Sequence, residues 1–235
     1  FIITIRVTIH NNFRVKMNRT LEYILKTIPD KTEWGSTTSK QMKYDIINWC
    51  GDRFKDKVAL EIGSHVGQTT MILGLLFKEV YTINNNRPEA GEHTLFEVTE
   101  EIEDRPFYYS ITRCNIKNSL NYKFENVYHV YQDAYDSRGL CPNIPNIDVS
   151  FIDCLHTYDA VDIDIKNSIM KSAKHIIFDD LGRYKEIRNC VGKYIDVGVL
   201  KESRRIGWEE GIHIINETGQ KREFFDNEGI ICQVV

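Results

Sequence analysis

The chain has 235 residues, a length that suits one α/β domain with some extra elements. Apolar residues make up 42% of it, which is enough for a substantial core. The formal net charge of −4 gives no electrostatic reason for tight binding to a nucleic-acid backbone, and no apolar run approaches the roughly 20 residues of a membrane span. We therefore expect neither a nucleic acid nor a membrane among its partners.

The first residues differ in character from the rest of the chain. Residues 1–16 alternate enough to form a strand, and Met17 is a plausible natural start. We treat residues 1–16 as an N-terminal extension of open status and residues 17–235 as a single domain. The extension and the late strands could each pair two copies of the chain, so a homo-oligomer is one expectation.

Helical and strand patterns alternate along the remaining chain. Apolar spacing predicts helices at 18–28, 39–50, 68–77, 157–173 and 184–195, with Asn18 and Ser39 as N-caps. Buried strands are expected at 58–62, 79–83, 127–131, 147–153 and 175–180, and two late strands at 200–208 and 229–235 are expected to pair. Residues 92–126 are ambiguous, and we interpret them as a helix, a polar connection and another helix.

This alternation predicts the class of fold. Strands that alternate with helices form a mostly parallel sheet with helices on both faces. We therefore expect a Rossmann-like, doubly wound α/β domain with a seven-stranded sheet.

The cysteines and the composition bear on the compartment. The six cysteines are scattered and form no C-x-x-C pair, so no zinc motif is present. Because the chain is of this size and its cysteines are spread along it, we interpret them as reduced thiols in a cytosol-like compartment. The expected location is cytoplasmic. A composition rich in Asn, Lys, Ile and Tyr would suit an AT-rich genome, including that of a virus acting in a host cytoplasm.

The turn after the first buried strand has the pattern EIGxxxG at residues 61–67. Gly63 lets a ligand approach the backbone, and Gly67 eases packing of the strand on the helix. A carboxylate at Glu61 suits a ligand with an ammonium or sulfonium better than a pyrophosphate. A tight βα turn with a solvated Glu61 explains this turn alone equally well.

With these features the chain resembles the class I S-adenosylmethionine (SAM)-dependent methyltransferases, from about Trp34 to the C-terminus. The resemblance is closest to the branch of catechol O-methyltransferase and the metal-dependent sugar O-methyltransferases. It rests on the segments LEIGSHVGQTT, VYTINNN, VYQDA, FIDCLHTYDAV and HIIFDD.

The resemblance implies three contacts with SAM. The Gly-containing turn would hold the methionine end, the end of the second strand the ribose, and the loop after the third strand the adenine. The residues at these positions are Glu61, Gly63, Ser64, His65, Gly67 and Thr69, then Asn84 and Asn85, then Gln132, Asp133 and Ala134. The loop at residues 32–39 could close over the site, with Trp34 stacking on an adenine or a sugar. A buried Trp34 that packs under the sheet is an equal alternative.

Asn84 departs from the family pattern, which usually has an acidic residue there to accept both ribose hydroxyls. An amide accepts one hydrogen bond and donates another, but it lacks the charge that strengthens the pair. We therefore expect weaker cofactor binding. A non-catalytic binding module with this fold remains an alternative.

Three aspartates end the fourth and fifth strands: Asp153, Asp179 and Asp180. Neighbouring strands lie about 4.8 Å apart, so these carboxylates should converge, and they would repel each other without a cation. Oxygen ligands favour Mg²⁺, with Mn²⁺ as a substitute, and the resembled branch binds its divalent ion at these positions. Alternatively, Asp180 caps a turn and Asp153 is a solvated strand end.

His156 lies three residues beyond Asp153, where catechol O-methyltransferase keeps its lysine base. A near-neutral imidazole can accept the proton of a hydroxyl as the methyl group arrives, although a structural histidine is the alternative. We therefore predict a SAM-dependent O-methyltransferase with Asp153 and His156 as catalytic residues. The expected acceptor is a small molecule, with a sugar or glycan residue favoured and a catechol-like phenol second.

Overall fold

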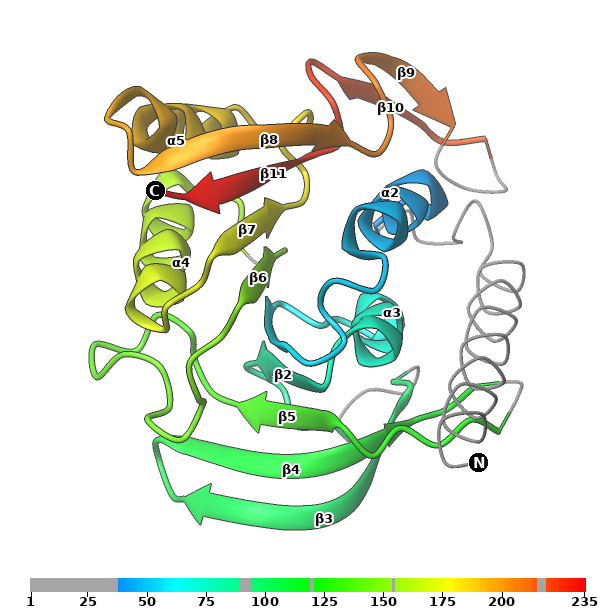
Figure 1. Cartoon of the computed structure of the whole chain (residues 1–235), viewed down its shortest axis with the longest axis vertical. Helices are drawn as coiled ribbons and strands as arrows, with labels where there is room; N and C mark the ends of the chain where they lie inside the picture. Colours follow the sequence, from blue (N-terminus) through cyan, green and yellow to red (C-terminus); the bar gives the residue numbers. More distant parts are fainter. Residues whose placement is uncertain (1–37, 89–93, 119–120, 154, 215–218) are drawn as a thin grey trace, which may run out of the picture.

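The computed structural model describes residues 38–88, 94–118, 121–153, 155–214 and 219–235 (Figure 1). The extension at 1–16, the helix expected at 18–28 and Trp34 lie outside these ranges. No helix among the described residues is both long and apolar enough to cross a membrane. The five described cysteines are buried and free of disulfides.

A nine-stranded sheet with the strand order β3-β4-β5-β2-β1-β6-β7-β11-β8 forms the centre of the domain. Five neighbouring strands run parallel to one another. They are β1 (Val58–Ile62), β2 (Glu79–Asn84), β5 (Val127–Tyr131), β6 (Val149–Ile152) and β7 (His175–Phe178). The late strands β8 (Leu200–Ile206) and β11 (Gly229–Val234) pair antiparallel as expected, and β11 lies between β7 and β8.

In the described ranges of the chain, two helices lie on each face of the sheet (Figure 1). One face carries α2 (Lys40–Cys50) and α3 (Gln68–Leu76), and the other carries α4 (Tyr158–Met170) and α5 (Lys185–Asp196). Successive strand residues point to opposite faces, so Ala59 packs in the core with α2 and α3, whereas Leu60 packs in the core with α4 and α5. The predicted doubly wound α/β class is confirmed.

The predicted helices at 92–126 are wrong. This segment contains a hairpin of β3 (Phe96–Arg105) and β4 (Tyr109–Ile116), and β4 pairs with β5, so the sheet has nine strands instead of seven. Glutamates favour helices over strands, and the exposed residues of β3 show no apolar alternation that would indicate a strand. Five of the eight residues of β4, among them Ile111, are buried, and β4 pairs with β5, which joins the hairpin to the sheet.

A second hairpin was not predicted. Strands β9 (Gly211–Ile214) and β10 (Lys221–Phe224) lie between β8 and β11 in the sequence and pair in a separate two-stranded sheet. Both strands are short and largely exposed, so their apolar pattern is weak.

Candidate functional site

The turn between β1 and α3 has the backbone shape that its glycines allow. Gly63 and Gly67 have φ angles of 95° and 97°, in the region that L-residues with a Cβ rarely adopt. A Cβ on Gly67 would lie 3.1 Å from the ring of Phe96, the first residue of β3. Gly67 therefore packs the turn directly under the hairpin, and His65, also at positive φ, is exposed beside it.

Glu61 lies beneath this turn and is fully buried. Its Oε2 accepts hydrogen bonds of 2.6 Å from the hydroxyls of Thr70 and Thr82. Its Oε1 is buried and has no partner among the described residues. Burial raises the pKa of Glu61 to about 7. The alternative of a solvated Glu61 is therefore wrong, and the carboxylate offers one unpaired acceptor.

The end of β2 lies against the same turn. The Asn84 amide donates to Ser64 Oγ at 3.1 Å, and Asn84 Oδ1 accepts from the backbone N–H of Asn86 at 3.1 Å. Asn85 is exposed. The structure thus brings the predicted methionine-binding and ribose-binding residues into direct contact.

The loop after β5 holds its predicted residues in different ways. Gln132 is buried, donating to the Gly139 carbonyl at 2.7 Å and accepting from the Cys141 N–H at 2.8 Å, so its side chain closes its own loop. Asp133 is exposed, and Ala134 is buried. Of the three residues predicted to contact adenine, Asp133 has the most accessible side chain.

The carboxyl ends of β6 and β7 bring Asp153, His156 and Asp180 together. His156 Nε2 lies 3.1 Å from Asp180 Oδ2 and 3.8 Å from Asp153 Oδ1. One ligand atom from each of the three residues lies within 4.8 Å of the others. The His156 ring stacks on Tyr184, with a centroid distance of 4.1 Å and an interplanar angle of 5°.

These groups perturb one another. Burial alone would lower the pKa of His156, but the facing carboxylates of Asp153 and Asp180 outweigh it and raise that pKa to about 9. Burial raises the pKa of Asp153, and the Asp180 charge adds to that effect. The His156 ring lies closer to Asp180 Oδ2 than the guanidinium of Arg183 does, at 3.1 Å against 3.9 Å.

Asp179 does not join this group through its side chain. Its Oδ2 accepts from the Thr38 hydroxyl at 2.7 Å, and its Oδ1 accepts from the N–H of Asp180 at 2.6 Å. Thr38 Oγ1 also lies 3.3 Å from Thr69 Oγ1, at the start of α3. Burial raises the pKa of Asp179 well above its ordinary value, and the charge of Asp153 raises it further. Asp179 thus connects β7 to the entrance of α2 and to α3.

The fold has counterparts among solved structures, although no family model and no curated protein matches the sequence. The O-methyltransferase TomG from Streptomyces achromogenes is 11% identical with a TM-score of 0.54, over 92% of this chain and 96% of that one. The tRNA (m1A58) methyltransferase TrmI from Aquifex aeolicus is 15% identical with a TM-score of 0.50, over 92% of this chain and 76% of that one. The chain has the Rossmann-like fold of SAM-dependent methyltransferases. At such identities the likeness establishes the fold alone, and the metal-dependent branch stays a prediction.

Near this site of the methyltransferase fold lie two buried charged residues that the sequence patterns do not indicate, Lys43 and Glu228. Lys43 of α2 is fully buried and donates to the Thr38 carbonyl. Burial lowers the pKa of Lys43 to about 8, against the opposing charges of Asp179 and Glu228. Glu228 is buried as well and accepts from both the N–H and the hydroxyl of Ser39. A lysine beside Met42 on the apolar face of α2 was the signal that could have revealed this network.

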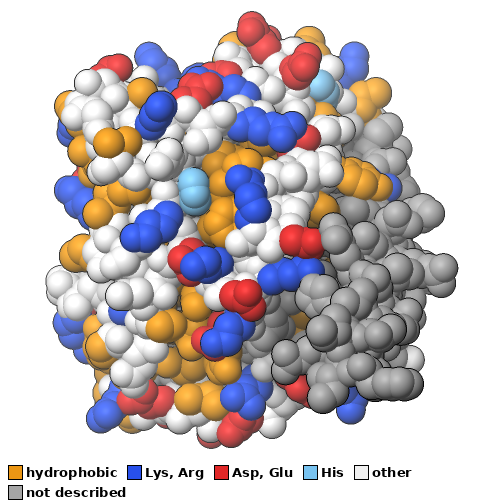
Figure 2. Space-filling view, viewed as in Figure 1, with side chains coloured by type: hydrophobic (Ala, Val, Ile, Leu, Met, Phe, Trp, Pro, Cys, Tyr) orange, Lys and Arg blue, Asp and Glu red, His pale blue; other side chains and the backbone are white. Residues whose placement is uncertain are grey.

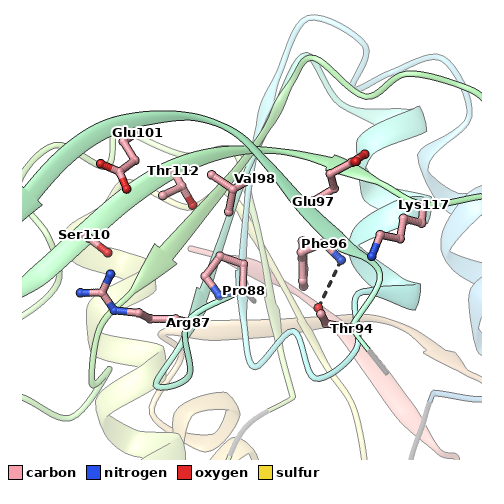
Figure 3. Close-up of a pocket in the computed structure, with 10 residues that line it drawn as sticks. All are labelled: Arg87, Pro88, Thr94, Phe96, Glu97, Val98, Glu101, Ser110, Thr112 and Lys117. Atoms are coloured by element: carbon pink, nitrogen blue, oxygen red, sulfur yellow. Dashed lines mark hydrogen bonds between the residues drawn. The ribbon is translucent and has the colours of Figure 1, made fainter. Parts of the chain in front are cut away.

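A cleft of about 450 Å³ opens beside the glycine turn of the methyltransferase fold. It lies between the β3–β4 hairpin and the segment that follows β2, and Phe96, which covers Gly67, is part of its wall. Figure 3 shows polar side chains at both ends, with Arg87, Ser110 and Glu101 at one end and Thr94, Glu97 and Lys117 at the other. The hairpin therefore walls the region next to the predicted ribose position.

Proposed function

We propose that the chain is a SAM-dependent O-methyltransferase that methylates a hydroxyl of a small molecule, with a sugar or glycan residue as the acceptor and a divalent ion assisting. One observation supports this proposal above all. The Asp153 N–H donates to the carbonyl of Ile62 at 2.9 Å. Asp153 therefore lies directly beside the residue that precedes the glycine turn. A methyl donor in the turn and an acceptor at Asp153 would be neighbours.

The residues of the turn fit SAM. The unpaired Oε1 of Glu61 suits an ammonium donor, and the positive φ of Gly63 permits close approach of a ligand to the backbone. Ser64 and Asn84 add a hydroxyl and an amide beside the turn. When bound, SAM supplies a methyl group already activated by its sulfonium, so the protein's task is to align the acceptor oxygen and exclude water.

The residues at β6 and β7 fit a divalent ion. Two carboxylates and an imidazole converge there, a donor set that divalent metals accept. An ion bound there would hold the acceptor's oxygens and lower the pKa of its hydroxyl. Asp153 and Asp180 would bind it directly. With the pKa of His156 near 9, its imidazole is charged at neutral pH in the metal-free protein and cannot then accept a proton.

A small acceptor is favoured over RNA by the surface charge. On the face shown in Figure 2, Lys and Arg side chains are interspersed with Asp and Glu, and the net charge is −4. Strong binding to a phosphate backbone requires clustered basic residues.

The test is calorimetric titration of S-adenosylhomocysteine (SAH) into the full chain, in Mg²⁺ and in EDTA. We expect saturable one-site binding in both buffers, weakened at least tenfold by Glu61→Gln. Glu79→Gln, at the start of β2, is the matched control and should bind as the wild type does. Absence of binding in both buffers would overturn the proposal.

A transfer assay with methyl-labelled SAM then identifies the acceptor class. Sugars, catechols and a tRNA are compared at equal concentration, and label on a sugar hydroxyl supports the proposal. Label on a phenol or on RNA instead would show that the acceptor is of that class and not a sugar. SAH binding without transfer to any acceptor would favour the non-catalytic binding module.

A further inference from the structure

The sequence assigns the third ligand of the divalent ion to Asp179, and the structure assigns it elsewhere. We propose that His156 is the third protein ligand, with Asp153 and Asp180, and that Asp179 does not bind the ion. The site would then bind Mn²⁺ in preference to Mg²⁺. This inference rests on the divalent ion of the proposed function.

The separations of the three ligand atoms agree with this assignment. Ligands about 2.1 Å from one small divalent ion lie about 3 Å apart when adjacent and about 4.2 Å apart when opposite. His156 Nε2 lies 3.1 Å from Asp180 Oδ2 and 3.8 Å from Asp153 Oδ1. Small rotations of these side chains would therefore suffice to place all three atoms around one ion.

His156 is already oriented for this role. Its ring lies flat against Tyr184, and the following residue, Thr157, is the N-cap of α4. Its Nε2 is buried and makes no hydrogen bond of good geometry, although it faces two carboxylates. A buried nitrogen between two carboxylates, without a hydrogen bond of its own, is what a metal ligand requires before the ion arrives.

Asp179, in contrast, is already hydrogen-bonded to its surroundings. Both of its oxygens accept hydrogen bonds, from the Thr38 hydroxyl and from the Asp180 N–H, and only 4% of the residue is exposed. Turning its carboxylate toward an ion would leave both donors unpaired in a buried region, which is costly.

The ligand set determines the choice of metal and the role of His156. Mg²⁺ prefers oxygen ligands, whereas Mn²⁺ lies closer to the metals that accept an imidazole nitrogen. A nitrogen that binds the ion has no free electron pair for a substrate proton. The two functions considered for His156, ligand and base, therefore exclude each other.

The experiment uses the full chain stripped with EDTA. Mn²⁺ and Mg²⁺ are titrated by calorimetry, and the Mn²⁺ complex is examined by electron spin-echo spectroscopy for coupling to an imidazole ¹⁴N. We expect Mn²⁺ to bind at least about tenfold more tightly than Mg²⁺, with a ¹⁴N signal. His156→Gln should abolish that signal and weaken Mn²⁺ binding at least about tenfold. Asp179→Asn should change the Mn²⁺ affinity by less than about threefold.

The control variant is His213→Gln, which removes a histidine of the β9–β10 hairpin and should change neither signal nor affinity. Loss of Mn²⁺ binding in a folded Asp179→Asn variant, together with retention in His156→Gln, would overturn the inference. If Asp179→Asn fails to fold, the ¹⁴N signal of the wild-type protein tests the inference by itself. Absence of that signal would also overturn the inference.

The outcome is separable from that of the proposed function, because SAH binding is measured in EDTA. A Mn²⁺ complex with ¹⁴N coupling but no SAH binding would support the proposed ligands and contradict the methyltransferase proposal. SAH binding without any metal binding would contradict the proposed ligands and leave the methyltransferase proposal standing.

Discussion

The carboxyl edge of the parallel strands has two halves that are built differently. The donor half, residues 61–67, 84–85 and 132–134, relies on backbone shape and on bonds between neutral groups, as between Asn84 and Ser64. The acceptor half contains Asp153, His156 and Asp180, whose charged groups face one another, and Asp179, whose carboxylate accepts from Thr38. The donor half therefore depends on glycine conformation, and the acceptor half depends on a positive charge.

The largest expected effect comes from breaking the backbone of the donor half. In Gly67→Val, the valine backbone would have to adopt a φ near 97°, and the valine side chain would collide with the Phe96 ring. Strain and overpacking together should cost about 3 kcal/mol or more of unfolding free energy. Urea denaturation measures this cost, and SAH titration should show no binding.

The matched control for this substitution lies in α5. A Cβ on Gly192 would contact nothing within 4 Å, so Gly192→Ala should stabilise the protein by about 0.5–1 kcal/mol through helix propensity. Equal stability of the Gly67→Val variant and the wild type would show that the turn does not depend on its glycine.

The buried carboxylate of the donor half, Glu61, should make stability depend on pH. Burial raises the folded-state pKa of Glu61 to about 7, above its unfolded value, so the folded protein keeps a proton that the unfolded chain loses. This contribution is complete below about pH 4 and is lost as the pH rises through 7, up to about 3 kcal/mol in total. Urea denaturation between pH 5 and 8 should show this decline.

Glu61→Gln should remove most of that pH dependence, because the glutamine does not ionise. Glu79→Gln should keep the slope of the wild type. A slope that persists unchanged in Glu61→Gln would assign the pH dependence to other buried groups, such as Asp164, whose pKa burial also raises to about 7.

The acceptor half should respond to metal. At 100 times its dissociation constant, Mn²⁺ should raise the unfolding free energy by about 2.7 kcal/mol, because it binds the folded chain only. Asp180→Asn should lose most of this stabilisation and retain that of SAH, as measured by thermal unfolding with each ligand. An unchanged Mn²⁺ effect in this variant would place the metal elsewhere.

Much of the fold was predictable because its apolar residues are periodic. The strand at 58–62 was predicted with its observed bounds, and Ser39 caps α2 as expected, accepting from the Met42 N–H at 3.0 Å. The β3–β4 hairpin was not predictable from periodicity, because nine of the ten residues of β3 are exposed or half-buried. The hairpin is held on the sheet by the pairing of β4 with β5, the next strand along the chain.

The site was predictable at the level of strand ends but not of side-chain direction. Neighbouring strands do bring Asp153 and Asp180 together, as parallel pairing requires. The carboxylate of Asp179 instead accepts from the Thr38 hydroxyl and from the Asp180 N–H, contacts that the expectation of three converging carboxylates did not include. The pairing of Asp179 with Thr38 involves residues 141 positions apart, which no local pattern reveals.

The smallest expected effect is a gain in the donor half, from Asn84→Asp. The carboxylate would still accept from the Asn86 N–H, and its second oxygen would be available to the Ser64 hydroxyl or to a ribose hydroxyl. A charge-assisted bond to the ribose should tighten SAH binding roughly fivefold, or about 1 kcal/mol. Calorimetry in EDTA measures this without any contribution from the acceptor half.

Asn85→Asp is the control for charge alone, because it adds the same carboxylate one residue later at an exposed position. Its effect on SAH affinity should stay below twofold. An equal gain in both variants would mean that a general negative potential attracts the ligand. No gain in Asn84→Asp would mean that the ribose lies away from β2, and that the donor half binds its cofactor through the glycine turn and Glu61 alone.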